Sequence, residues 1–258
     1  MAILRKYKIC CLPLIMTAMA LFFACGFTPY HTPKELPEGL EIPEYDSGED
    51  IVVHTGYTAS YNHATLCPDW VAWELTAEEV NGTQEGKVSF SRDPDVADPK
   101  ASREDYSKSG WDKGHMAPRA DMKWSATALK ESYFFTNICP QEHTMNSSAW
   151  RKIEELARHV ALRRGSVYVV CGPIFNEHRH GSIGAGGVQV PDAFFKALAI
   201  SVNGNFQTVA FLMDNEPQTY SPRHYAVSVD SVESVIGRNL FPQLDEEVER
   251  GYDWNVWK

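Results

Sequence analysis

The sequence predicts an α+β fold, and two observations support that prediction. Segments with the composition of strands outnumber segments with the periodicity of helices, and the two kinds rarely alternate along the chain. Between Ile51 and Arg250 the composition is uniform, without a linker-like break or an internal repeat. We therefore expect residues 51–258 to form a single domain, which is enough chain for one large hydrophobic core.

Strands are predicted wherever β-branched and aromatic residues gather between turn residues. In chain order the predicted strands are Ile51–Val53, Trp70–Leu75, Tyr133–Ile138, Ser166–Cys171, Val188–Val190, Phe194–Val202 and Phe206–Met213. Asn203-Gly204 lies between the last two segments, and this dipeptide favours the tight turn of a β-hairpin. The last two strands are therefore expected to be neighbours in a sheet.

The clearest helix is predicted over Ser147–Arg164. Its apolar residues recur at the spacing of one helix face, and they are Ala149, Trp150, Ile153, Leu156, Ala157, Val160 and Ala161. Val232–Ile236 and Leu244–Val248 are expected to form shorter helices. The long helix is expected to lie beside the sheet.

Residues 1–24 have the composition of an export signal. Cationic residues between Arg5 and Lys8 precede an apolar, nearly uncharged run from Ile9 to Ala24. That run is slightly too short to span a bilayer, so we expect it to direct export and not to anchor the chain.

Two cleavage sites are compatible with this export signal. A small residue precedes Cys25, as in a lipoprotein cleavage box, which favours a lipid on Cys25, and the alternative is cleavage after Ala18-Met19-Ala20. The protein is therefore expected to be a membrane-anchored lipoprotein or a periplasmic or extracellular protein. Residues 25–50, rich in Pro and Glu, are expected to form a flexible tether.

The charge of the chain restricts how it can bind nucleic acid. The formal net charge is −10, whereas a protein that simply coats nucleic acid is basic. Phosphate groups would have to bind at a concentrated local site, together with a cation. Cys67, Cys139 and Cys171 lie beyond Cys25 and are expected to be buried free thiols, with a disulfide between two of them as the alternative.

The candidate site residues fall in two parts of the sequence. His115 lies in the stretch SGWDKGHMAPRADM, and an imidazole suits general-base catalysis because its free pKa is near neutrality. Further on, Asn146, Trp150, Glu154 and Arg158 follow one another at intervals of four, so their side chains form one ridge along the predicted helix. An amide oxygen and a carboxylate are suitable ligands for Mg²⁺. A base, a metal site and a cation are what phosphodiester hydrolysis requires.

Each of these residues also has an ordinary structural explanation. Asn146 stands where a helix N-cap belongs, and Glu154 and Arg158 have the favourable order of a helical ion pair. A lone histidine such as His115 is more often structural than catalytic. Only the combination of the four residues favours a site.

Two motifs make the resemblance to a known family specific. Asp105-Tyr106 followed by the segment 109–115, Ser-Gly-Trp-Asp-Lys-Gly-His, resembles the signature of the DNA/RNA non-specific endonucleases, which usually read Asp-Arg-Gly-His at its end. Thr136–Gln141 and Met145–Trp150 resemble the second motif of that family. Weaker similarities extend the resemblance from about residue 51 to 244. The resemblance implies the ββα-metal (His-Me finger) nuclease fold, in which a central antiparallel sheet has flanking helices.

The resemblance also implies a role for each matching residue. His115 would be the general base that removes a proton from the attacking water. Asn146 would be the direct protein ligand of a hydrated Mg²⁺, for which Mn²⁺ is expected to substitute, and Glu154 would orient waters on that ion. Arg158 would pair with phosphate oxygens as charge develops on them.

Four further residues are expected to support the site. Asp112 would contribute to catalysis by orienting the motif or its histidine, and Asn137 would support the ion site and substrate binding. Lys113 replaces the arginine of the usual motif and offers phosphate a point charge in place of a planar fork. Arg119 is expected to supply some of that planar contact, with a solvated surface role as the alternative.

The sequence therefore predicts an exported, Mg²⁺-dependent endonuclease that hydrolyses DNA and RNA with little sequence preference. A rival hypothesis is a surface protein that binds nucleic acid on the same fold but is catalytically weak or inactive, which the acidic charge and Lys113 favour. A second enzymatic alternative is a phosphodiesterase restricted to one nucleic acid or to short oligonucleotides.

Overall fold

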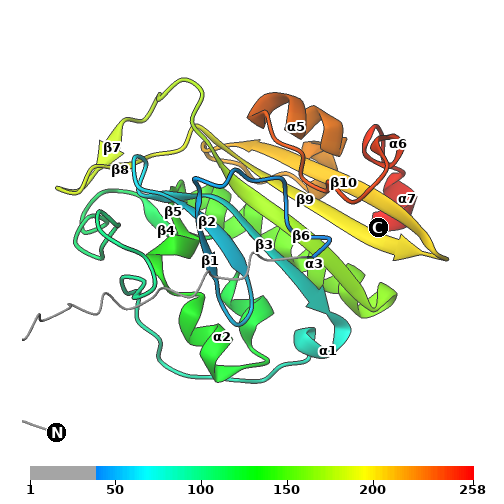
Figure 1. The fold of residues 1–258 in the computed structure, drawn as a ribbon, viewed down its shortest axis with the longest axis horizontal. Helices are drawn as coiled ribbons and strands as arrows, with labels where there is room; N and C mark the ends of the chain where they lie inside the picture. Colours follow the sequence, from blue (N-terminus) through cyan, green and yellow to red (C-terminus); the bar gives the residue numbers. More distant parts are fainter. Residues whose placement is uncertain (1–38) are drawn as a thin grey trace, which may run out of the picture. The chain divides into compact units, whose positions relative to one another are not determined.

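The computed structural model describes residues 39–258 (Figure 1). The expected export signal, Cys25 and most of the expected tether lie outside the described residues. None of the helices within residues 39–258 is long and apolar enough to cross a membrane.

An antiparallel sheet of seven strands forms the centre of the domain, with the strand order β1-β2-β3-β6-β9-β10-β11. Its strands are β1 (Asp50–Val53), β2 (Thr58–Asn62), β3 (Cys67–Thr76), β6 (Ser166–Ile174), β9 (Ala193–Val202), β10 (Asn205–Asp214) and β11 (Ala226–Val227). The tight turn at Asn203-Gly204 joins β9 to β10, which pair along their whole length as predicted. The fold is therefore α+β with a central antiparallel sheet.

A separate hairpin and the helix after it form the ββα unit of the domain. Strand β4 (Asp112–His115) pairs antiparallel with β5 (Ile138–Gln141), and His115 lies opposite Ile138. A π-helical turn, η3 (Met145–Trp150), then leads directly into α3 (Arg151–Arg164), which ends at Gly165 with φ 96°. This unit contains both sequence motifs.

Alternating side chains of the sheet build two hydrophobic cores, one on each face. In β9, Phe194 and Leu198 belong to the core shared with α3, whereas Phe195 and Ala197 belong to the other core. Helix α5 (Val229–Ile236) covers that second face through Val229 and Val232 (Figure 1). The candidate site lies on the α3 side.

Short elements connect these layers. They are α1 (Ala77–Val80), η1 (Arg119–Met122), α2 (Ala126–Glu131), η2 (Phe135–Asn137), β7 (Ser182–Ile183), β8 (Val188–Gln189), α4 (Pro222–Tyr225), α6 (Glu246–Glu249) and α7 (Trp254–Trp257). Cys67, Cys139 and Cys171 are buried free thiols, as expected.

One predicted strand is wrong. The aromatic residues of Tyr133–Ile138 predict an extended segment, but Phe135–Asn137 forms the 3-10 helix η2 and β5 begins only at Ile138. The aromatic side chains of this segment pack into the protein although the backbone forms a tight turn here. Tertiary packing therefore overrides the strand propensity of the segment. Strands β2, β4, β7 and β11 are not among the predicted strands.

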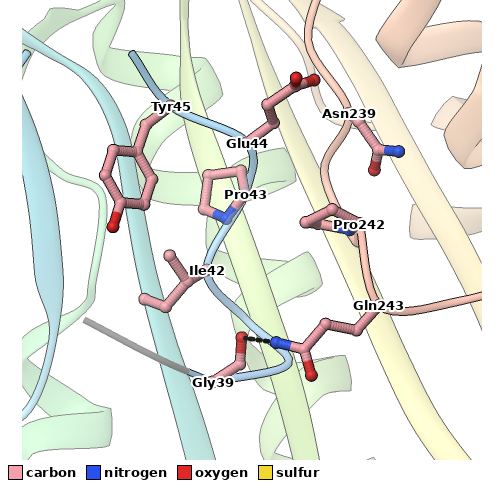
Figure 2. A pocket seen from close by; sticks show the side chains of 8 residues that line it. All are labelled: Gly39, Ile42, Pro43, Glu44, Tyr45, Asn239, Pro242 and Gln243. Atoms are coloured by element: carbon pink, nitrogen blue, oxygen red, sulfur yellow. Dashed lines mark hydrogen bonds between the residues drawn. The ribbon is translucent and has the colours of Figure 1, made fainter. Parts of the chain in front are cut away.

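The expected tether begins to pack against the domain well before residue 50. Ile42 is buried in the core that also contains α5, and the backbone N–H of Glu44 donates to Asn239 O at 2.9 Å. Figure 2 shows a pocket between this segment and residues 239–243, where the Gln243 side chain donates to Gly39 O at 2.8 Å. Residues 39–49 therefore belong to the folded domain, because their apolar side chains pack in the same core as α5.

Replacing Ile42 by alanine tests this boundary. We expect Ile42→Ala to lower the free energy of unfolding by about 2 kcal/mol, because a buried aliphatic side chain is lost. Val53→Ala is the matched control, since Val53 is 46% exposed and its loss should cost less than about 0.5 kcal/mol. Equal denaturant midpoints for the two variants would show that residues 39–49 add no stability.

Candidate active site

The end of β4 places His115 beside the start of α3. Gly114 is required for this arrangement, because a Cβ at that position would collide with the side chain of Gln141 on the paired strand. The Trp150 indole N–H, at the end of η3, donates to the His115 carbonyl oxygen at 3.2 Å. The two motifs are therefore joined directly at the histidine.

Asn137 fixes the chain on the other side of His115. Its Oδ1 accepts from the Ala117 N–H at 2.8 Å, and its Nδ2 donates to the backbone oxygens of Ala117 and Ser132, both at 2.8 Å. The side chain is completely buried, and its amide is occupied by backbone groups. Asn137 therefore positions the turn after His115, and its predicted part in substrate binding stays a prediction.

The imidazole of His115 lies against an aromatic wall. Its ring centroid is 5.4 Å from that of Phe90 and 5.0 Å from that of Tyr133. Nε2 is buried and has no hydrogen-bond partner among the described residues. Burial, followed by the charge of Arg119, lowers the pKa of His115 to about 4. The ring is therefore neutral at physiological pH and can accept a proton.

Asp112 orients the amide of Asn146. Its Oδ2 accepts from Asn146 Nδ2 at 3.0 Å and lies 3.0 Å from His143 Nδ1. Because Nδ2 of Asn146 is held by this carboxylate, Oδ1 is the amide atom left for a cation. Asp112 thus acts on the amide of Asn146, whereas the sequence predicted an action on His115 or on the motif.

Glu154 and Arg158 follow on the same side of α3. Burial raises the pKa of Glu154 to about 7, and the nearby Lys196 ammonium opposes that effect. Arg158 donates from NH1 to Asp121 Oδ1 at 2.8 Å, and the Asp121 side chain is completely buried. This ion pair holds one edge of the guanidinium, and the Arg158 side chain remains 18% exposed.

These side chains surround one cavity of about 330 Å³. It is lined by His115, Pro118, Arg119, Ala120, Asn146, Ser147, Arg151, Glu154, Glu155 and Arg158. The predicted base, metal ligand, carboxylate and cation therefore share a single cavity. The pocket in Figure 2 lacks these groups, since Glu44 is the one titratable carboxylate in its lining and no histidine lines it.

The two other predicted substrate contacts have different positions. Arg119 lines the cavity, and its NH2 donates to Glu85 Oε2 at 2.9 Å. Lys113 is not one of the lining residues, because its Nζ lies over the rings of Phe90 and Tyr106, 5.6 Å from each centroid. A substrate contact by Lys113 stays a prediction, which Lys113→Arg tests through turnover and substrate preference.

The donor atoms at this cavity suit a hydrated Mg²⁺. Mg²⁺ prefers oxygen ligands and keeps several waters, so one amide oxygen and one nearby carboxylate are sufficient. Asn146 and Glu154 provide these groups. Within residues 39–258 no cluster of three His, Cys, Asp or Glu side chains could hold a metal.

Sequence reasoning did not identify every residue that lines or supports the cavity, and Asp121 and Arg151 are two that it missed. Asp121, the partner of Arg158, lies in the same stretch as His115, but no pattern in the sequence linked it to the helix. Arg151 lines the cavity and is held by Glu155, with 2.7 Å between NH1 and Oε1. Arg151 is not in the series of residues four apart that starts at Asn146, so the helical spacing did not identify it as a site residue.

A family model described as DNA/RNA non-specific endonuclease matches residues 38–247. The chain belongs to this family. Nuclease EXOG, mitochondrial, from Xenopus laevis is 32% identical over 240 residues, which cover 85% of this chain and 66% of that protein. A protein named nuclease from a Nostoc species is 28% identical over 238 residues, covering 84% of each chain.

The fold comparison agrees with the family assignment. A crystal structure of an EndoG/EndoGI complex matches with a TM-score of 0.73 and 26% identity, covering 80% of this chain and 90% of that chain. This match shows the ββα-metal nuclease fold for the chain. Among the mitochondrial relatives, the chain spans 66% of the Xenopus laevis EXOG protein and 59% of the Homo sapiens one.

The protonation of His115 provides a test that needs no substrate. In the metal-free protein we expect the ring to titrate near pH 4, in contrast to the usual value near 6.5, when followed by NMR. Phe90→Ala should raise this pKa, because opening the aromatic wall restores water to the charged ring. A midpoint near 6.5 in the unaltered protein would contradict the buried, neutral base.

Proposed function

We propose that this protein is a metal-dependent endonuclease that hydrolyses phosphodiester bonds of DNA and RNA with little sequence specificity. The observation that carries the proposal is the single cavity lined by His115, Asn146, Glu154 and Arg158. The family membership and the names of the relatives support the same reaction class. Residues 1–24 support the further proposal that the protein is exported.

His115 is the proposed general base. Its neutral ring accepts a proton from a water molecule as that water attacks the phosphorus atom. The aromatic wall of Phe90 and Tyr133 excludes water from one side of the ring and fixes its plane. The hydrogen bonds of Asn137 and Trp150 to the neighbouring backbone hold the ring at the cavity.

Asn146 is the proposed protein ligand of the metal, and Glu154 is the proposed residue that orients waters on it. A bound Mg²⁺ supplies charge that stabilises the leaving oxygen, and Mn²⁺ is expected to supply the same chemistry. Asn146 presents its amide oxygen because Asp112 holds the amide nitrogen. Glu154 lies farther along the cavity and accepts hydrogen bonds from water.

Arg158 is the proposed phosphate contact. Its salt bridge to Asp121 leaves part of the guanidinium at the cavity, so it can donate to phosphate oxygens while charge develops on them. Arg119 and Arg151 add charge along the same cavity. Contacts of this kind reach the backbone of nucleic acid and not its bases, which accounts for low sequence specificity.

A cleavage assay tests the proposal directly. Protein lacking residues 1–38 should cleave plasmid DNA and RNA with Mg²⁺ and lose that activity in EDTA. His115→Ala should lower kcat by about 10²-fold or more, because the base is lost. His159→Ala is the matched control on the exposed side of α3. Cleavage in EDTA, or equal rates for both histidine variants, would overturn the mechanism.

The role of the cavity arginines predicts a salt effect on binding. In the His115→Ala background, Arg151→Ala should reduce the slope of log Kd against log salt by about one, because one phosphate contact is lost. Arg250→Ala is the matched control, since Arg250 forms the same type of i,i+4 pair, with Glu246, but does not line the cavity. An unchanged slope for Arg151→Ala would remove it from the phosphate contacts.

A further inference from the structure

A lysine is completely buried beneath the candidate active site. Lys196 lies in β9 between Phe195 and Ala197, and its side chain is 0% exposed. By strand alternation it points to the face of the sheet that packs against α3. Burial of an ammonium group is costly unless the charge is balanced, so this position requires a physical explanation.

The contacts of Lys196 lead to the backbone around His115. Its Nζ lies 3.4 Å from the carbonyl oxygen of Met116, to which it donates. The same atom lies 4.3 Å from the ring centroid of Trp150, whose indole N–H donates to the His115 carbonyl oxygen. Lys196 thus holds the Met116 carbonyl oxygen, and the indole that it packs against holds the carbonyl oxygen of His115.

The charges near Lys196 belong to the same site. Asp121, which binds Arg158, is completely buried and has one oxygen, Oδ2, without a hydrogen-bond partner among the described residues. Burial raises the pKa of Asp121, and the charges of Arg158 and then Lys196 oppose that effect. Lys196 is therefore one of the cations near the carboxyl group that holds Arg158.

We propose that Lys196 is a positioning residue of the active site, which holds the carbonyl oxygen of Met116 and packs against the indole that holds the carbonyl oxygen of His115. Its side chain has no exposed surface, so it acts through the residues it contacts. The inference rests on the proposed nuclease function. Its effect is on the placement of the base.

Lys196→Met separates positioning from simple packing. Methionine has a similar length and shape without the charge, but removal of one member of a group of buried charges leaves the others uncompensated and lowers stability. We therefore expect the variant to have a lower Tm while it remains folded at the assay temperature. We expect kcat to fall by about 10-fold to 10²-fold with little change in KM, because misplacement of the base slows the chemical step.

Two further variants complete the experiment. Lys130→Met removes the same charge from an exposed position on α2 and should leave kcat and KM unchanged. Lys196→Arg keeps the charge and should retain more turnover than Lys196→Met. Wild-type kcat in Lys196→Met, or a loss of kcat that only follows a loss of Tm in both Lys196 variants, would overturn the proposal.

NMR spectra, which do not depend on turnover, distinguish the proposed nuclease function from the proposed positioning role of Lys196. Lys196→Met should shift the NMR resonances of the Met116 and Ala117 amides and of the His115 ring, whereas Lys130→Met should not. If the unaltered protein cleaves no nucleic acid but these shifts occur, the proposed function fails and the positioning role stands. If the protein cleaves nucleic acid and Lys196→Met changes neither these shifts nor kcat, the positioning role fails.

Discussion

The side-chain amide of Asn137 is the constraint on which the site depends. It bonds both backbone groups of Ala117 and the carbonyl of Ser132, so it holds the chain that leaves β4 against the chain that enters β5. The four residue pairs of the β4–β5 ladder alone are a short hairpin, which is marginal in isolation. Asn137 thus holds the chain around this hairpin, the Trp150 indole joins His115 to the start of α3, and His115, Asn146 and Glu154 line one cavity.

The arrangement of charge resolves the conflict between an acidic chain and a phosphodiester substrate. The arginines at the cavity are each held by a carboxylate: Arg119 by Glu85, Arg151 by Glu155 and Arg158 by Asp121. Of these three pairs, only that of Arg158 has a fully buried partner, so it is screened least by solvent and is fixed most firmly. Three arginine side chains therefore line the cavity where phosphate is expected to bind, although the net charge of the chain is −10.

Much of this arrangement could be predicted from the sequence, because it follows from local periodicity. The long strands show dense β-branched composition, and the intervals of four residues place Asn146, Glu154 and Arg158 on one side of a helix. The contributions of Asn137, Asp121 and Lys196 could not be predicted, because each acts through contacts between segments distant in the sequence. Residues 39–49 looked like a tether for the same reason, since the partners of Ile42 lie on α5 and the sheet.

The central claim is that a neutral imidazole at the position of His115 removes the proton from the attacking water. Chemical rescue tests it most directly: cleavage by His115→Ala is measured with and without added imidazole, over a range of pH. The account predicts that imidazole restores part of the lost rate in proportion to its neutral form, because the space between Phe90 and Tyr133 can hold the free ring. A folded His115→Ala protein that binds nucleic acid but gains no rate from imidazole would contradict the claim.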